Sequence, residues 1–336
     1  MHHKVCHLVP IYYYLESFRP FSMRLLAFSL GFSLVLIGAA VSFGQKTAET
    51  NKQNVRTVTI PISIFSKSEL KQDQMQEFVQ VDRLIVKEDK DEQSVLSIRS
   101  VETTPLSLAV LLQEDLSQEI NLQLKDLRDF VQTLPRGSRV MVAYVHGGSL
   151  RVRQRFTDNL LKASEAIRII GGTPSSNGPY EGVEEATNYF DALPTGRRAI
   201  ILISDGLDAS RGVSASDTLS SPDMDRAILK SQRRGIAVYS IWSPASLTKD
   251  SNSTLVGFGQ SALAKLSDET GGRSFYQGSI PPVSLIPYLR DLIILLERQF
   301  ALTYLSTHMK KGYHRVEVSS TNPDIRIEHP KGYYYR

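Results

Sequence analysis

The segment LSLAVLLQEDLSQE, residues 106–119, decides the fold class of this chain. Its first seven residues form a nearly unbroken apolar run, which is typical of a strand buried on both faces. Polar and acidic side chains follow from Gln113 onward. Strands of this kind belong to parallel sheets covered by helices, and such sheets bind ligands beyond the carboxyl ends of their strands.

The sequence around this strand alternates between strand and helix patterns from residue 103 to residue 299. This rhythm predicts an α/β fold, a doubly wound and mostly parallel sheet with helices on both faces. A hairpin is expected across His146-Gly147-Gly148. Further strands are expected at 138–145, 149–156, 197–204 and 235–242, and helices at 119–134, 158–170, 180–193, 223–234, 261–270 and 283–299.

Both flanks of this region carry β patterns instead. Residues 55–102 and 300–336 contain short alternating runs rich in β-branched residues. Because chain ends commonly lie close together, we expect the two flanks to pair into one β-rich unit. The closing KGYYYR, residues 331–336, is interpreted as an edge strand with aromatic packing or as a contact surface.

Residues 1–44 are expected to be a targeting segment outside the fold. The run MRLLAFSLGFSLVLIGAAVSFG, residues 23–44, has the basic start, apolar middle and small final residues of a secretory signal peptide, with Met23 as the expected start. The apolar run is close to the length that spans a bilayer, so an uncleaved anchor is the alternative. Residues 45–54 resemble a linker, and we expect a secreted, periplasmic or cell-surface protein.

The composition excludes several classes of protein. A chain of 336 residues with 41% hydrophobic and 22% charged residues can bury a full core. Its only cysteine, Cys6, lies in the targeting segment, so the rest of the chain has no disulfide and no cysteine metal site. A net charge of +4 argues against a nucleic-acid binder, which usually has a concentrated basic face.

Three loops at expected strand ends carry oxygen-bearing side chains. The first loop offers Gln113, Asp115 and Ser117, the loop at 171–173 offers Thr173, and the loop after 197–204 begins with Asp205. Oxygen ligands from separate loops suit a hard divalent cation such as Mg²⁺ or Ca²⁺. These residues are therefore candidate metal ligands.

Each candidate residue also has a structural explanation that involves no metal ion. Asp115 or Ser117 suits the cap of the following helix, where an acidic first turn interacts favourably with the helix dipole. Thr173 suits a hydroxyl in a glycine-rich turn, and Asp205 suits a turn before Gly206. The residues alone leave these alternatives open.

Taken together, the loops resemble those of von Willebrand factor A domains, and in particular a bacterial secreted subgroup with a related domain. The resemblance covers residues 105–299, and the flanking β segments and the closing KGYYY are also similar to that subgroup. It implies a doubly wound sheet and a metal-ion-dependent adhesion site. That site consists of an Asp-x-Ser-x-Ser loop, a Thr on a second loop and an Asp on a third.

The match to this site is incomplete. Thr173 in GGT matches the second element and Asp205 in ILISDG the third, but Gln113 stands at the position of the first Asp. Asp115 and Ser117 stand at the two Ser positions, and a register shifted by two residues keeps an Asp and a Ser. The resemblance thus implies a degenerate site with Asp115, Ser117, Thr173 and Asp205 as ligands of Mg²⁺ or Ca²⁺, and Gln113 as a weak or water-mediated ligand.

The function implied by the resemblance is protein binding in adhesion or assembly, with an acidic residue of the partner completing the cation's coordination. The first alternative is the same fold with an inactive metal site, acting as a metal-independent structural or assembly protein. No nucleic-acid partner is expected, and a membrane is expected only if the targeting segment is not cleaved.

A secreted α/β hydrolase is the second alternative, but enzymatic activity is not expected. HGGS at 146–149 is similar to an esterase oxyanion loop, yet no Gly-x-Ser-x-Gly elbow supplies a nucleophile. GFGQSA at 257–262 is interpreted as a loop at a helix start rather than a dinucleotide site. Beyond residue 44 the histidines are scattered along the sequence, and they are interpreted as surface or strand-face residues: His146, His308, His314 and His329.

Overall fold

The protein is described here by a computed structural model. It describes residues 54–66, 84–100, 105–171, 178–194, 196–210, 221–249 and 253–335, all within the compact unit Lys52–Arg336. The expected targeting segment 1–44, nearly all of the expected linker, and Thr173 lie outside the described residues. Within these ranges, none of the helices combines the length and apolar character needed to cross a membrane.

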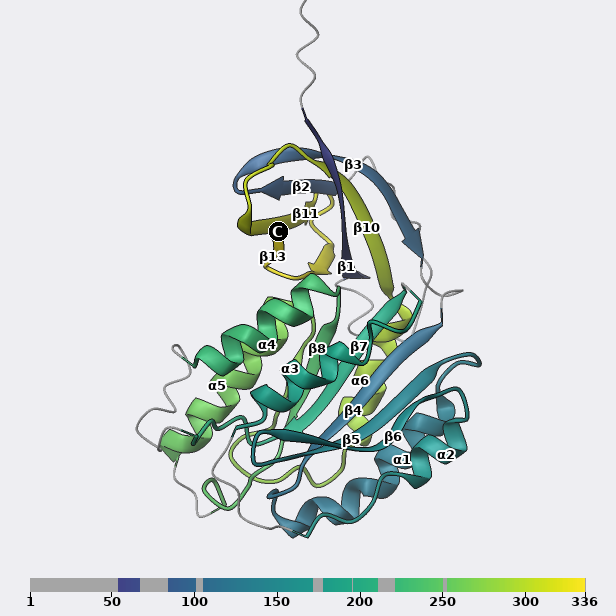
Figure 1. The fold of residues 1–336 in the computed structure, drawn as a ribbon, viewed down its shortest axis with the longest axis vertical. Coiled ribbons are helices and arrows are strands. Elements are labelled where there is room, and N and C mark those ends of the chain that lie inside the picture. The colour runs from purple at the N-terminus through teal and green to yellow at the C-terminus, as the bar shows by residue number, and fades with distance from the viewer. Residues whose placement is uncertain are drawn as a thin grey trace, which may run out of the picture. The chain divides into compact units, whose positions relative to one another are not determined.

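A six-stranded sheet forms the central layer of residues 106–275 (Figure 1). Its strand order is β6-β5-β4-β7-β8-β9, and every neighbouring pair is parallel except the hairpin β5–β6. Gly147 and Gly148 make that hairpin turn with φ values of 56° and 77°, a backbone region that glycine enters without strain. The strands are β4 Leu106–Gln113, β5 Arg139–His146, β6 Ser149–Thr157, β7 Arg197–Ser204, β8 Ala237–Trp242 and β9 Ser274–Phe275.

Strand β4 divides its side chains between two hydrophobic cores, because successive residues of a strand point to opposite faces. Leu108 and Val110 enter a core with side chains of α1, α2 and α6, whereas Ala109 and Leu111 enter a core with α3, α4 and α5 (Figure 1). Both faces are therefore covered, and the predicted doubly wound fold is confirmed. The helices are α1 Leu124–Thr133, α2 Leu160–Glu165, α3 Tyr180–Asn188, α4 Pro222–Arg233, α5 Ser253–Thr270 and α6 Ile286–Glu297.

The predicted helix at 158–170 is shorter than expected, because side chains satisfy the backbone after α2. The hydroxyl of Tyr144 accepts a hydrogen bond from the nitrogen of Arg168 and donates to its carbonyl. The side chain of Asn121 likewise binds both the nitrogen and the carbonyl of Ile170. With these polar groups paired, a further helical turn is not needed to bury them. The predicted helix at 119–134 also begins differently, as a 3-10 turn, Gln118–Gln123, before α1.

The interpretation of GFGQSA as a loop before a helix is wrong, since α5 begins at Ser253 and contains the motif. Gly259 instead permits a close contact between α5 and the segment after β7. A Cβ atom at Gly259 would lie 1.9 Å from the carbonyl oxygen of Asp205. Gly206, with a φ of 75°, makes the reciprocal contact, because a Cβ atom there would lie 2.3 Å from the carbonyl oxygen of Gly259. The glycine pair thus fixes the position of the Asp205 segment.

A seven-stranded antiparallel sheet joins the two flanks of the chain, in the order β12-β1-β10-β3-β2-β11-β13. It has its own core, with Ile62, Val86 and Leu302 at the centre. The predicted β-rich unit built from both flanks is therefore confirmed, and KGYYYR contributes the edge strand β13. The strands are β1 Arg56–Ser66, β2 Leu84–Glu88, β3 Asp91–Ser100, β10 Gln299–Ser306, β11 Gly312–Ser320, β12 Ile325–Glu328 and β13 Gly332–Tyr335.

Candidate functional site

The carboxyl ends of β4 and β7 lie side by side where the strand order of the six-stranded sheet reverses. The chain leaves β4 toward β5 on one side and later returns to β7 on the other. Open α/β sheets bind ligands in the crevice at such a point. Gln113 ends β4, Ser204 ends β7 and Asp205 follows directly, so three polar residues meet there. We call the loops that follow these two strands the switch-point edge.

Gln113 connects the two strand ends through its side-chain amide. Its Nε2 donates to Oδ1 of Asp205 over 3.0 Å, and its Oε1 accepts from the hydroxyl of Ser204 and from the backbone nitrogen of Asp205, the latter over 3.3 Å. The backbone N–H can only donate, so the atom facing it is the amide oxygen and the amide nitrogen faces the carboxylate. The orientation of Gln113 is therefore determined by its partners.

Asp205 is buried and accepts further hydrogen bonds. The nitrogen of Leu207 donates to Oδ1 over 3.2 Å, and the hydroxyl of Thr248 lies 3.5 Å from Oδ2. Burial and the negative charge of Asp115 raise the pKa of Asp205 to about 7, although the hydrogen bonds from Gln113, Leu207 and Thr248 act in the opposite direction. Part of the Asp205 population is therefore protonated near neutral pH.

Asp115 and Ser117 are also buried, in the turn between β4 and the 3-10 turn. This segment packs on the chain after β8, because the nitrogen of Ser117 donates to the carbonyl of Pro244 over 2.8 Å and Leu116 forms a β-bridge with Ala245. Ser117 precedes the 3-10 turn, but its side chain makes no capping hydrogen bond. The helix-cap explanation of Ser117 is therefore not supported.

Glu114 points away from this buried network. Its carboxylate lies 3.0 Å from Nη1 of Arg151 and 3.1 Å from Nδ1 of His146. Arg153 lies 3.9 Å from the same carboxylate. The HGGS segment thus forms a hairpin turn whose neighbouring charges pair with Glu114.

The predicted site residues that the structure describes lie at the switch-point edge. Gln113 and Asp205 are directly hydrogen-bonded, and Asp115 is near enough for its charge to raise the pKa of Asp205. Ser117 lies in the same loop as Asp115, whereas Thr173 lies outside the described residues. Sequence reasoning missed three residues that hold this edge: Ser204, Thr248 and Tyr180, whose hydroxyl donates to the carbonyl of Gly206 over 2.6 Å.

These residues do not fit a directly bound divalent cation in the arrangement described. Mg²⁺ and Ca²⁺ take oxygen ligands, but Gln113 presents an amide nitrogen to Asp205. The oxygen of Gln113 is already used by Ser204 and by the backbone of Asp205. A cation would have to displace this amide, so the neutral residue at the family's Asp position changes the chemistry of the site.

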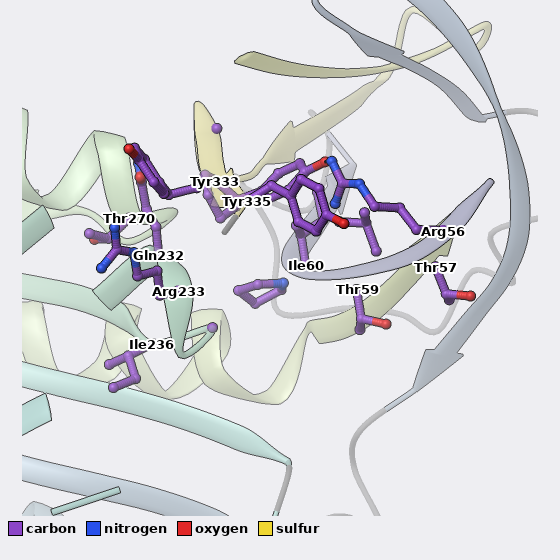
Figure 2. A pocket seen from close by; sticks show the side chains of 16 residues that line it. Arg56, Thr57, Thr59, Ile60, Gln232, Arg233, Ile236, Thr270, Tyr333 and Tyr335 are labelled. Carbon is purple, nitrogen blue, oxygen red and sulfur yellow. The ribbon is translucent and has the colours of Figure 1, made fainter. Parts of the chain in front are cut away.

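A cavity of about 210 Å³ lies between β1, α4 and β13 (Figure 2). Its wall contains Arg56, which lies 3.9 Å from the ring centroid of Tyr335 and 5.0 Å from that of Tyr333. Arg233 of α4 lies over the ring of Tyr334, 4.4 Å from its centroid. The volume is below the roughly 300–1,000 Å³ that small-molecule sites occupy. We interpret this cavity as a packing feature held by cation–π contacts.

Two of the later histidines, interpreted from the sequence as surface or strand-face residues, lie close together in the structure. The rings of His308 and His314 lie 5.9 Å apart in the antiparallel sheet, beside Asp89. His308 follows β10, His314 lies in β11 and Asp89 lies in the turn between β2 and β3. Asp89 comes from one flank of the chain and the two histidines from the other, so the pairing of strands between the flanks brings Asp89 to the histidines.

No protein-family model matches the sequence, and no curated protein matches it. Solved structures do match. A von Willebrand factor type A structure from Catenulispora acidiphila is 12% identical, covers 86% of this chain and 76% of its own, and has a TM-score of 0.42. An aerotolerance-related membrane protein from Bacteroides fragilis is 13% identical, covers 57% of this chain and 98% of its own, and has a TM-score of 0.41. Manganese-loaded TRAP protein from Plasmodium vivax is 10% identical, covers 73% of this chain and 97% of its own, and has a TM-score of 0.41. The family that the sequence resembles is thus among the structural matches.

Proposed function

We propose that this chain is a non-enzymatic, protein-binding module of the von Willebrand A type, which works outside the cytoplasm and contacts its partner through the switch-point edge without a resident cation. The observation that carries this proposal is the hydrogen bond from Gln113 to Asp205. An amide donor occupies the side of the carboxylate that a cation would otherwise need. Secretion is supported by the signal pattern at 23–44 and stays a prediction.

The buried network prepares the edge for binding. Gln113, Ser204 and Thr248 hold Asp205, and Tyr180 holds the carbonyl of Gly206, so the loop is ordered before any partner arrives. A preorganised surface loses less conformational entropy on binding than a disordered one. This supports a binding role more than a catalytic one, because the hydroxyl of Ser204 donates to an amide rather than to a base.

Exposed charge on β6, beside the switch-point edge, suggests how a partner is selected. Arg151 and Arg153 are about half exposed, with relative side-chain areas of 52% and 51%, and both lie beside Glu114. Guanidinium groups bind carboxylates well. Acidic side chains of a protein partner therefore suit this surface without an intervening cation.

A cation-dependent form of this function is the second candidate. Here Mg²⁺ or Ca²⁺ would be held by Asp115, Ser117, Thr173 and Asp205, and a carboxylate of the partner would complete the coordination. The favouring observation is that the charge of Asp115 raises the pKa of the buried Asp205. A cation between two such carboxylates would relieve their repulsion.

A thermal-unfolding comparison separates the two candidates. We expect millimolar Mg²⁺ or Ca²⁺ to leave the melting temperature of the wild-type protein unchanged. The variant Gln113→Asp restores the family's carboxylate, and we expect it to gain a melting-temperature increase with the same ions. A cation-dependent increase in the wild type that Asp205→Ala abolishes would establish the cation-dependent form instead.

A further inference from the structure

Three potential metal ligands converge on the antiparallel sheet, far from the switch-point edge in sequence. One ligand atom from each of Asp89, His308 and His314 lies within 4.8 Å of the other two. Nδ1 of His314 is 2.7 Å from Oδ2 of Asp89, and Nδ1 of His308 is 3.9 Å from the same oxygen. We call these three residues the histidine cluster.

The backbone positions Asp89 for this contact. Asp89 and Lys90 form the two-residue turn between β2 and β3 with φ values of 50° and 81°, an unusual conformation for residues other than glycine. The turn is held by Arg315 of β11, whose nitrogen donates to Oδ1 of Asp89 and whose carbonyl accepts from the nitrogen of Asp89, each over 2.9 Å. Oδ1 is thereby anchored, and Oδ2 is left facing the histidines.

The contacts of His314 turn Nε2 toward the carbonyl of Lys310 and Nδ1 toward Asp89. Nε2 lies 2.7 Å from the carbonyl oxygen of Lys310, which can only accept, so Nε2 carries a hydrogen. Nδ1 faces Oδ2 of Asp89 and, at 3.4 Å, Oε1 of the buried Glu88. A lone pair cannot face two carboxylates favourably. A cation held between Nδ1 and these carboxylate oxygens would satisfy all of them.

His308 has the orientation expected of a second imidazole ligand. Its Nδ1 is the nitrogen nearer to Asp89, and its Nε2 lies 3.3 Å from Oδ2 of Asp91. Metal-binding histidines commonly pair the other ring nitrogen with a carboxylate or carbonyl, as His314 does with Lys310. The side chain of His308 is partly exposed, so an ion can reach the cluster from solvent.

The local charge also favours a cation. The carboxylates of Glu88, Asp89 and Asp91 lie around the two rings, and Arg56 contacts Glu88 at 3.3 Å. Two imidazoles and a carboxylate are ligands of Zn²⁺ and neighbouring transition metals, whereas Mg²⁺ and Ca²⁺ prefer oxygen alone. We propose that Asp89, His308 and His314 bind a Zn²⁺-type divalent metal ion, which fastens the β2–β3 turn to β11 and to the segment after β10.

Zn²⁺ titration of the chelator-treated, untagged full chain tests this site. We expect calorimetry to show Zn²⁺ binding and thermal unfolding to show a higher melting temperature with Zn²⁺ but not with Mg²⁺. In His308→Ala we expect both the Zn²⁺ binding by the cluster and the increase in melting temperature to be lost. The matched control is His146→Ala, which removes a partly exposed histidine outside the cluster and is expected to bind Zn²⁺ as the wild type does.

Two further measurements keep the test decisive. Asp91→Asn retains all three ligands and removes one nearby negative charge, and we expect it to weaken Zn²⁺ binding by about 10-fold. His2, His3, Cys6 and His7 contribute equally to every variant, so differences between variants report on the cluster. Equal Zn²⁺ binding by the wild type, His308→Ala and Asp91→Asn would overturn the proposal, and His314 and Asp89 would then form an ion pair only.

Discussion

Asp205 and Asp89 are both carboxylates held at the end of a β-strand, but their side-chain partners differ. Asp205 faces hydrogen-bond donors, the amide of Gln113, the nitrogen of Leu207 and the hydroxyl of Thr248. Asp89 faces the ring nitrogens of two histidines, which can bind a proton or a metal ion. A carboxylate at the family's metal position is therefore not a metal ligand by location alone. Whether such a carboxylate can bind a metal ion depends on the atoms that face it.

The pKa values of the two carboxylates differ in the same way. Burial and the charge of Asp115 raise the pKa of Asp205. Burial alone would also raise the pKa of Asp89, but hydrogen bonds from His314 and from the backbone of Arg315 outweigh it, and the pKa is lowered. The switch-point edge thus favours a neutral acid, and the histidine cluster favours an anion beside a cation.

The pH dependence of stability is expected to be the largest effect at the switch-point edge. The folded pKa of Asp205, about 7, exceeds its unfolded reference of 3.8, so the folded state binds the proton more tightly. The stabilisation is complete below about pH 4 and is lost as the pH rises to about 7, which amounts to at most about 4 kcal/mol. Urea denaturation across this range should show the loss in the wild type and not in Asp205→Asn. An equal slope in both proteins would mean that Asp205 is ionised throughout.

Metal binding at the histidine cluster is expected to be the next largest effect. Zn²⁺ present at 100 times its dissociation constant for the cluster would stabilise the folded state by about 2.7 kcal/mol, because the cluster assembles only in the folded chain. The free energy of unfolding measured with and without Zn²⁺ checks this, with His308→Ala as the comparison. A gain that persists in His308→Ala would assign the effect to other ligands.

The fold could be predicted well from the sequence, because the burial of each strand leaves a pattern of apolar residues within that strand. The two-sided apolar run of β4 and the alternating flanks each indicate their sheet before any long-range contact is known. The site was predicted less well, since hydrogen bonds across the molecule define it. Ser204 stands directly before Asp205 and could have been found, whereas Thr248 has no local signal. In the histidine cluster, Asp89 lies 225 positions before His314, a separation that no spacing motif describes.

Removal of the Gln113 amide is expected to have a smaller effect, though still a measurable one. Gln113→Ala removes the acceptor of the Ser204 hydroxyl and one of the donors to the buried carboxylate of Asp205, and we expect a loss of about 2 kcal/mol. The matched control is Gln118→Ala in the 3-10 turn, an exposed position expected to change stability by less than about 0.5 kcal/mol. Urea denaturation of both variants measures the difference. Equal effects would show that Gln113 does not hold the two strand ends together.

The smallest effect is expected at the exposed side of the same loop, where Glu114 pairs with Arg151. Arg151→Ala should lower the free energy of unfolding by less than about 1 kcal/mol, because the pair is open to solvent. Added salt should remove this loss by screening the charges, whereas it should leave the loss in Gln113→Ala unchanged, since that amide is neutral and buried. Urea denaturation at low and high salt measures both. A salt-independent loss of several kcal/mol in Arg151→Ala would place Glu114 inside the buried network with Asp205, and the contrast between adjacent residues of one loop would then be lost.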